Sequence, residues 1–374
     1  MNYKKNIFLF LILAFSFSYS FAQAPNFDKT LASAAQGNPS AQRVLGLMYF
    51  NGQGVQKDDV KAFEWFLKAA AQGDPSAQFN LGLMYEYGLG VQKDDVKAFE
   101  WYSKAAAQGY APAQNNLGIM YEYGRSVKKD DVKAFEWYSK AAAQGDPSAQ
   151  FNLGEMYEYG LGVQKDDVKA FEWYSKAAAQ GYAPAQNNLG IMYEYGRSVK
   201  KDDVKAFEWY SKAAAQGDPS AQFNLGLMYL NGQGVQKDDV KAFAWYSKAA
   251  AQGDPSAQRA LGLMYLNGRG VQKDDVKAFE WYSKAAAQGD PSAQNNLGLM
   301  YEYGRGIQKD ATKAVEWYFK AANNGNATAQ FNIGQSYLNG SNGLSKNRVE
   351  ALNWLRKSAN NGVVQAKLIL AELQ

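Results

Sequence analysis

Apolar and polar positions recur along this chain with a period of 36 residues, and each period contains two stripes of helical spacing. Apolar or small residues follow one another at steps of three or four, which places them on one face of an α-helix. In the period that begins at Gly73, the first stripe consists of Ala77, Leu81 and Tyr85, and the second of Ala98, Tyr102 and Ala105. Gly88-Leu-Gly90 separates the two stripes, so each period predicts a hairpin of two helices.

Tryptophan marks the same period. The nine tryptophans follow one another at steps of 36 residues, with a last step of 37: Trp65, Trp101, Trp137, Trp173, Trp209, Trp245, Trp281, Trp317 and Trp354. A unit of this length cannot bury its own apolar face, so copies stack and contact their neighbours. We expect each tryptophan to lie in the core and to bridge neighbouring hairpins.

Turn and capping residues set the boundaries. Gly73-Asp74-Pro75 combines a helix-ending glycine, an N-cap aspartate and a proline suited to the first helical turn, and Asp94 or Asp95 is placed to cap the second helix. The fold class is therefore all-α, a solenoid of nine helix hairpins over residues 37–361. Residues 23–36 predict a degenerate N-terminal cap, and residues 362–374 predict a C-terminal capping helix.

Two strings of the repeat carry a resemblance. Ala77-Gln-Phe-Asn-Leu-Gly-Leu-Met-Tyr85 and Lys97-Ala-Phe-Glu-Trp-Tyr-Ser-Lys-Ala-Ala106 resemble the two helices of a tetratricopeptide repeat. The longer gap between them and the run Tyr-x-x-Gly-x-Gly-Val are similar to the Sel-one-like repeat family instead. This resemblance implies a right-handed α-α superhelix whose first helices line the concave side.

Residues 1–22 differ from the repeats. Lys4 and Lys5 precede an apolar run, and small residues precede a cleavage site after Ala22, which is the order of a bacterial secretory signal peptide. We expect a periplasmic or secreted protein with no stable membrane insertion after cleavage. The alternative is an uncleaved membrane anchor, for which the apolar run is short.

Composition narrows the possible functions. The chain has no cysteine and no histidine, which removes disulfides, a cysteine-linked lipid and imidazole chemistry. Without Lys4 and Lys5, 38 basic residues face 36 acidic ones, so charge gives no reason to expect a nucleic-acid partner. The Asp94-Asp95 pair and its copies are better explained as helix caps than as metal ligands. We expect no metal and no cofactor.

An enzymatic alternative has one motif behind it. Ser126-Val-Lys-Lys129, copied at Ser198 to Lys201, spells the Ser-x-x-Lys of penicillin-recognising enzymes, so a β-lactam-acting or peptidoglycan-acting repeat enzyme is the second hypothesis. Neither Ser-Asp-Asn nor Lys-Thr-Gly accompanies it. Catalysis needs a unique constellation, whereas the polar residues here recur from repeat to repeat. A non-catalytic scaffold that binds a protein or a peptide is the first hypothesis, and a cytosolic adaptor is the third.

The resemblance to tetratricopeptide repeats implies a ligand groove formed by first-helix residues that face away from the core. The candidates are Phe79, Asn80, Leu83, Glu86, Tyr87, Asn116, Glu122, Tyr123, Asn152, Glu155, Glu158, Tyr159, Asn188, Glu194, Tyr195 and Asn224. In that family the recurring asparagine holds ligand backbone. The aromatic, apolar and acidic character predicts a partly apolar, net basic segment. Hydrogen bonds between helices are the competing explanation for the asparagines, and packing between helices is that for the phenylalanines.

Overall fold

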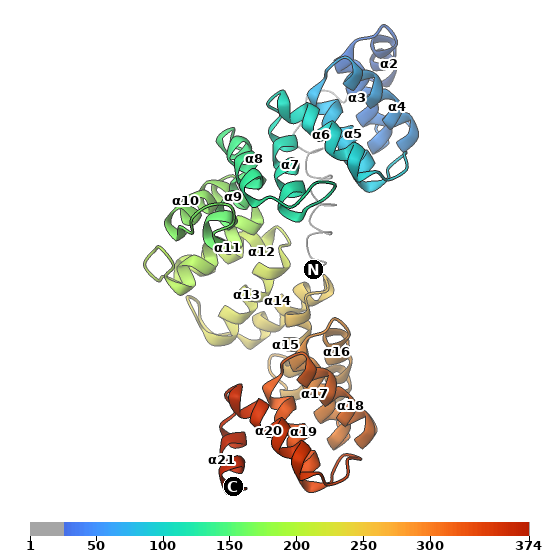
Figure 1. The fold of residues 1–374 in the computed structure, drawn as a ribbon. Helices are drawn as coiled ribbons and strands as arrows, with labels where there is room; N and C mark the ends of the chain where they lie inside the picture. Colours follow the sequence, from blue (N-terminus) through green and yellow to red (C-terminus); the bar gives the residue numbers. More distant parts are fainter. Residues whose placement is uncertain (1–25, 374) are drawn as a thin grey trace. The chain divides into compact units, whose positions relative to one another are not determined.

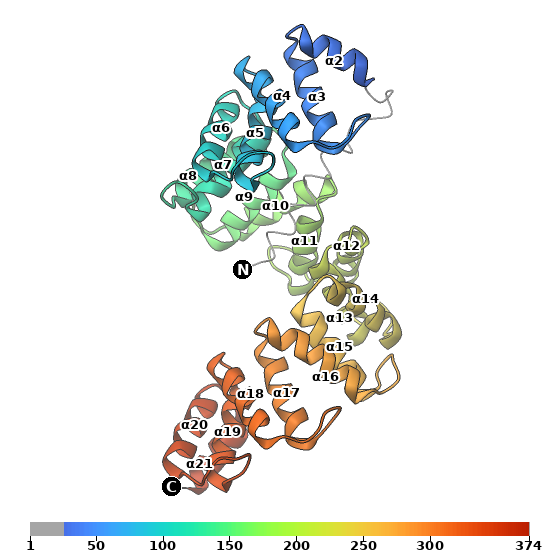
Figure 2. The same cartoon turned by 90° about the vertical axis from the view of Figure 1, so that its right-hand side faces the viewer.

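The computed structural model describes residues 26–373, and every regular element in that range is an α-helix. The helices are paired in hairpins that follow one another along the chain (Figures 1 and 2). They form two compact units that divide between Asp166 and Asp167. The expected signal peptide of residues 1–22 lies outside the described residues.

Among the described residues the first unit contains eight helices. They are α2 (Phe27–Ala35), α3 (Pro39–Asn51), α4 (Asp59–Ala71), α5 (Pro75–Tyr87), α6 (Asp95–Ala107), α7 (Ala111–Tyr123), α8 (Asp131–Ala143) and α9 (Pro147–Tyr159). Inside the unit each helix packs against the helices before and after it.

The second unit contains the remaining twelve. They are α10 (Asp167–Ala179), α11 (Ala183–Tyr195), α12 (Asp203–Ala215), α13 (Pro219–Asn231), α14 (Asp239–Ala251), α15 (Pro255–Asn267), α16 (Asp275–Ala287), α17 (Pro291–Tyr303), α18 (Ala311–Asn323), α19 (Ala327–Asn339), α20 (Arg348–Asn360) and α21 (Val364–Glu372). The all-helical hairpin fold expected from the sequence is confirmed for both units.

The helix ends follow the capping residues. Asp74 accepts a hydrogen bond from the backbone N–H of Ala77 at 2.8 Å, and Pro75 occupies the first turn of α5. Gly88 ends α5 in the left-handed conformation with φ of 70°, which costs glycine little. Asp94, the first of the two candidate caps, accepts from the backbone of Lys97 at 3.0 Å and so begins α6.

Within a hairpin the two helices meet at a glycine and a tyrosine. Tyr102 of α6 is completely buried, and its ring lies over Gly82 of α5. A methyl group on Gly82 would stand 2.4 Å from the ring, so no larger residue fits there without a shift. The same contact joins Gly118 to Tyr138 and Gly298 to Tyr318. The first-helix glycine therefore sets the distance between the paired helices.

A buried glutamine joins one hairpin to the next. The side chain of Gln78 donates to the carbonyl of Ala70 at the end of the preceding hairpin, at 3.2 Å. Its own oxygen accepts from Gln108 at 2.8 Å. Because an unpaired buried carbonyl is costly, this glutamine fixes how successive hairpins stack. Each repeat carries the equivalent residue, for example Gln42 and Gln222.

The tryptophans do not lie fully in the core, so that part of the expectation is wrong. Trp101 is half-buried and packs against a buried cluster formed by α2, α3, α4 and its own hairpin partner α5. Its outer face is covered by the ammonium group of Lys104, 4.0 Å from the ring centre. The completely buried ring is that of the neighbouring Tyr102. A tryptophan is large enough to reach the next hairpin while one face stays near water.

Both ends of the described chain carry a single additional helix. Ala34 of α2 accepts from Gln42, as Ala70 accepts from Gln78, so α2 stands where a second helix would stand in the repeat. At the other end, Ala366 of α21 is buried against α20, while Lys367 and Glu372 are exposed.

We expect Tyr102→Ala to destabilise its hairpin by about 3 to 5 kcal/mol, the range for truncating a buried large aromatic. Trp101→Ala should cost clearly less, because part of the indole already contacts water. Urea unfolding together with hydrogen exchange of α5 and α6 measures both. An equal or larger loss for the tryptophan variant would contradict the assignment of Tyr102 as the central core residue.

Candidate binding surface

The predicted groove residues lie on the first helices of both units. Helices α5, α7 and α9 of the first unit carry the candidates from Phe79 to Tyr159. Helices α11 and α13 of the second unit carry Asn188, Glu194, Tyr195 and Asn224. The residues divide into four groups by residue type and surroundings.

The phenylalanines belong to the packing between helices. The ring of Phe79 lies 5.7 Å from that of Tyr102 and 5.5 Å from that of Tyr110, and it is half-buried. Phe223 has the same relation to Tyr246, at 5.5 Å. Leu83 is also half-buried and packs against the cluster that α6 and α7 share. The competing explanation for the phenylalanines, helix packing, is therefore the correct one here.

Several asparagines bond to each other across adjacent hairpins. Asn152 donates to Asn115 at 2.9 Å, and Asn224 donates to Asn187 at 3.0 Å. These amides hold neighbouring first helices in register, as the alternative explanation expects. The acceptor is the residue that directly precedes the recurring asparagine in the preceding repeat. The pairs form where that residue is asparagine and not phenylalanine.

In the repeat before Asn116 this position is occupied by Phe79. Asn116 itself is only 6% exposed. Its amide nitrogen has no hydrogen-bond partner among the described residues. The expectation that Asn116 lines an open groove is therefore wrong, because the side chain is enclosed. Asn80 and Asn188 are half-buried, and Asn188 accepts a long hydrogen bond of 3.4 Å from Asn187.

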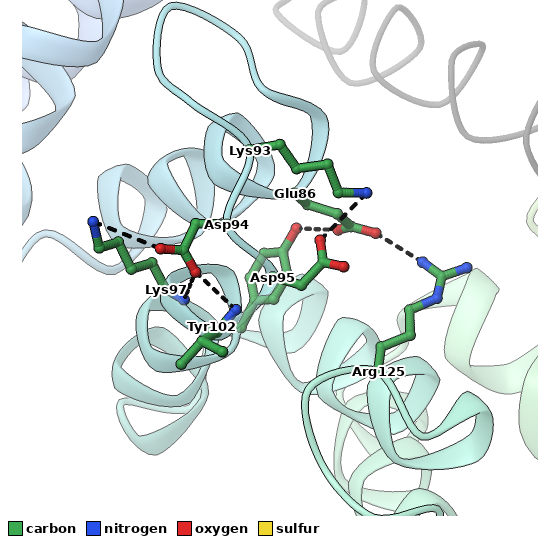
Figure 3. A network of polar contacts seen from close by, with 8 residues as sticks. Glu86, Lys93, Asp94, Asp95, Lys97, Tyr102 and Arg125 are labelled. Atoms are coloured by element: carbon green, nitrogen blue, oxygen red, sulfur yellow. Dashed lines mark hydrogen bonds and ion pairs between the residues drawn. The ribbon is translucent and has the colours of Figure 1, made fainter.

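Glu86 is held inside the array (Figure 3). Tyr102 donates its hydroxyl to one carboxylate oxygen of Glu86 at 2.7 Å, and Arg125 of the next repeat donates to the other oxygen at 2.9 Å. The residue is 8% exposed. The expectation that Glu86 contributes an open acidic surface is therefore wrong. Two donors saturate its carboxylate, and the ion pair links two hairpins.

Burial raises the pKa of Glu86 above its ordinary value of 4.5, although the Tyr102 hydroxyl and the Arg125 guanidinium oppose the shift. Burial also raises the pKa of Tyr102 well above 10, with the negative charge of Glu86 adding to it. The tyrosine therefore keeps its proton and acts as the donor.

The glutamates at the equivalent position in other repeats also accept a hydrogen bond from the tyrosine of the second helix. Glu122 accepts from Tyr138 at 2.7 Å, and Glu194 accepts from Tyr210 at 2.6 Å. Both glutamates are half-buried, as are Glu155 and Glu158. The acidic side chains are thus largely engaged within the hairpins, which weakens the expectation of a basic partner.

A sequence signal for this pairing exists and was missed. Each of these glutamates precedes its tyrosine by 16 residues. In the first repeat, where Phe50 stands in the glutamate position, Phe66 stands in the tyrosine position, so acceptor and hydroxyl are lost together.

The last tyrosine of several first helices is open to water. Four such side chains are well exposed: Tyr123 45%, Tyr159 63%, Tyr195 64% and Tyr303 66%. Tyr87 is half-buried, and burial raises its pKa. On α15, Leu263 is 46% exposed in the position of Leu83. Exposed tyrosines that recur on one element are typical of interaction surfaces.

Among the described residues no group of three or more acidic, histidine or cysteine side chains is arranged to hold a metal ion. None of the helices in residues 26–373 is long and apolar enough to cross a membrane. In the Ser126 motif, the ammonium group of Lys129 is paired with Asp131 at 3.3 Å. Ser126 itself is exposed and has a φ of 57°, in a position where other repeats have glycine.

Comparison with known proteins identifies the repeat. The Sel1 repeat profile matches nine times, over residues 39–74, 75–110, 111–146, 147–182, 183–218, 219–254, 255–290, 291–326 and 327–363. These are nine units in the expected period, with each boundary two residues later than the opening glycine.

Two solved bacterial structures are similar over most of the chain. A protective antigen of uropathogenic Escherichia coli strains with an SLR fold is 37% identical, with a TM-score of 0.66; the match covers 93% of this chain and 82% of that one. A Sel1 repeat protein from Oxalobacter formigenes is 36% identical, with a TM-score of 0.60; the match covers 83% of this chain and 90% of that one. No curated protein matches the sequence.

We expect Glu86→Gln to change how stability depends on pH. Because the pKa of Glu86 is raised on folding, the folded state binds more protons than the unfolded state between pH 4.5 and the higher folded value. The free energy of unfolding of the parent protein should therefore fall, relative to that of the variant, as the pH rises through this range. Urea titrations at a series of pH values measure the difference.

Glu100→Gln is the control, because Glu100 is an exposed glutamate on α6 of the same hairpin. If both variants track the parent protein in parallel, the buried carboxylate is not the source of the pH dependence.

Proposed function

Because the chain belongs to the Sel1-repeat family, whose repeats form protein-interaction scaffolds, we propose that it is a non-catalytic scaffold that binds a polypeptide along its first helices. The exposed tyrosines at the ends of α7, α9, α11 and α17 carry this proposal. In this reading the groove forms on the concave side of the repeats.

A tyrosine suits this task because it offers a large apolar ring and a polar tip, and it loses little conformational freedom on binding. In each unit the exposed rings lie at the same place in the repeat, one residue after the glutamate that the second helix holds. A partner segment that runs along several first helices would meet a ring at each of these repeats. The half-buried glutamates beside them then serve to fix the helix ends and not to attract charge.

The non-catalytic part of the proposal rests on the equivalence of the repeats. Residues 73–144 and 145–216 are identical except that Leu83 corresponds to Glu155. The one motif that suggests an enzyme occurs twice at equivalent loop positions, and in the first copy its lysine is already paired with an aspartate. Nothing in the described residues favours the β-lactam-acting or peptidoglycan-acting alternative over the scaffold.

We also propose that the scaffold acts outside the bacterial cytoplasm. The charged, apolar and small residues of positions 1–22 have the order of a cleavable signal peptide. The similarity to a protective antigen of uropathogenic Escherichia coli supports this proposal. The tight repeat interfaces need no disulfide, which suits a chain without cysteine in an oxidising compartment.

The double variant Tyr195→Ala, Tyr303→Ala should weaken capture of the native partner by about 10-fold to 100-fold, the loss expected for exposed aromatic anchors. Its melting temperature should stay close to that of the parent protein, because both rings are mostly in water. Pull-down from envelope extract, followed by calorimetry with the identified partner, measures the effect.

The matched control is Val204→Ala, Val276→Ala, which removes two exposed apolar side chains from the starts of second helices α12 and α16. Equal weakening by the control would place the binding surface elsewhere.

The mature protein should begin at Gln23 and be recovered from the envelope or the medium. N-terminal sequencing of the native protein after cell fractionation checks this. Recovery of a chain that still begins at Met1 in the cytosol would contradict export and favour the cytosolic adaptor.

A further inference from the structure

Two repeats of the second unit depart from the glutamate pattern in a specific way. Leu230 and Leu266 stand where five other repeats have a glutamate: Glu86, Glu122, Glu158, Glu194 and Glu302. The buried tyrosine that would donate to this glutamate is nevertheless kept, as Tyr246 and Tyr282. The arginine that pairs with Glu86 across the repeat boundary, Arg125, is kept in the equivalent positions as Arg269 and Arg305.

The consequence is clearest at Tyr282. Its side chain is completely buried, yet its hydroxyl has no hydrogen-bond partner among the described residues. Burial raises the pKa of Tyr282 to about 12, although Arg259, the amide of Asn296, which lies close enough to donate to the phenol oxygen, and Arg305 oppose the shift. The hydroxyl is therefore protonated at neutral pH and is an unused donor, which is costly in a protein interior.

Tyr282 also lines a small pocket. The pocket has a volume of about 120 Å³ and is lined by Leu266, Tyr282, Asn296, Leu299, Met300, Tyr303 and Arg305. Four of these residues carry polar groups: the phenols of Tyr282 and Tyr303, the amide of Asn296 and the guanidinium of Arg305. The remaining walls are mostly apolar.

The charge around the pocket favours an anion. Arg305 pairs with Asp275 at 3.6 Å, a longer contact than the 2.9 Å between Arg125 and Glu86. Arg259 pairs with Asp290 at 3.3 Å and also lowers the pKa of Tyr282, so a second cation lies near the hydroxyl. Arg305 is partly exposed, and Arg125, its equivalent in the Glu86 repeat, reaches a carboxylate at 2.9 Å.

We propose that this pocket binds a carboxylate of the partner polypeptide, held by the Tyr282 hydroxyl and the Arg305 guanidinium in the place that the Glu86 carboxylate occupies between Tyr102 and Arg125. The chain itself therefore provides the template for the bound state. The carboxylate of the partner takes the place of the glutamate carboxylate that this repeat lacks, because Leu266 stands in the glutamate position.

The occupant is an acidic side chain in an otherwise apolar segment. A carboxylate matches the two donors of the Glu86 site in size and in charge. Leu299, Met300 and Tyr303, whose ring is exposed, line the pocket, so apolar neighbours of the acidic residue would find apolar contacts there. The inference rests on the proposed function only in taking the ligand to be a polypeptide.

The test uses three short probe peptides and the full mature chain. Two acetylated and amidated tripeptides, Leu-Glu-Leu and Leu-Gln-Leu, differ only in the carboxylate, and a third, acetylated Leu-Gln-Leu with a free carboxyl terminus, supplies a chain end. The methyl signal of Met300, a residue of the pocket wall, reports binding in NMR titrations with methyl-labelled methionine.

We expect the Leu-Glu-Leu peptide to bind at least tenfold more tightly than its amidated glutamine counterpart. The free chain end should bind less tightly than the side-chain carboxylate if the pocket is made for an acidic residue. Tyr282→Phe and Arg305→Gln should each reduce the preference for glutamate over glutamine at least severalfold.

Leu266→Glu is the decisive variant, because it fills the site from inside with the residue that other repeats tolerate in this position. It should fold and lose the preference. Leu230→Glu makes the same change one repeat earlier and should keep it. The proposal is overturned if the three peptides act alike, if the chain end is preferred, if Leu266→Glu still discriminates, or if Leu230→Glu no longer does. Tyr195 is not among the pocket residues, so unchanged partner capture by a Tyr195→Ala single variant would count against the proposed function alone.

Discussion

The contact between a first-helix glycine and a second-helix tyrosine controls the geometry of this molecule. At Gly82 the ring of Tyr102 occupies the space that any side chain would need, so the two helices approach as closely as backbone and ring permit. The Tyr102 side chain extends across the hairpin, and its hydroxyl lies beside Glu86 near the end of the first helix. The glutamate that receives it, the arginine of the next repeat and the neighbouring exposed tyrosine all take their positions from this one contact. The same contact recurs in both units, which is why equivalent residues have equivalent surroundings.

The sequence was sufficient for the architecture and insufficient for the surface. Gly73-Asp74-Pro75 and Gly88 gave the ends of α5 correctly because capping depends on local backbone chemistry. The 36-residue period predicted the hairpins and their number correctly, because the same helical pattern recurs in nine copies and does not depend on the spacing within any one of them. What helical spacing alone did not decide was which polar residues are open. Glu86 and Asn116 fall on the face that was expected to meet a ligand, yet contacts from adjacent helices enclose them. Trp101 and Tyr102 are neighbours in the chain, and only packing distinguishes the buried ring from the one that a lysine covers.

The glutamate position shows how an array of near-identical units acquires local differences. The side chain at this position lies beside the tyrosine hydroxyl of the second helix. A substitution there therefore changes the surroundings of that hydroxyl but not the spacing of the two helices. A glutamate at this position accepts a hydrogen bond from the tyrosine, and Glu86 also forms an ion pair. Where Phe50 stands in its place, the tyrosine hydroxyl is absent as well. Where Leu266 stands in its place, the tyrosine hydroxyl remains and a pocket lies beside Leu266. One substitution per repeat therefore changes the polarity of the surface without changing the fold. Asn115 and Phe79 occupy a second variable position: Asn115 accepts a hydrogen bond from Asn152, whereas Asn116, in the repeat after Phe79, is enclosed.

The glutamine that links successive hairpins also bears on how the chain acquires its structure. Gln108 bonds to Gln78 across 30 residues, and the asparagine and glutamate bonds between repeats span 37 to 40. Contacts this local close small loops, so their entropic cost is low and folding is fast compared with that of a protein built on distant contacts. A chain that emerges gradually, from a ribosome or from a pore, can complete each hairpin joint once about one further period has appeared. Structure can thus grow in the direction of emergence without waiting for the last residue.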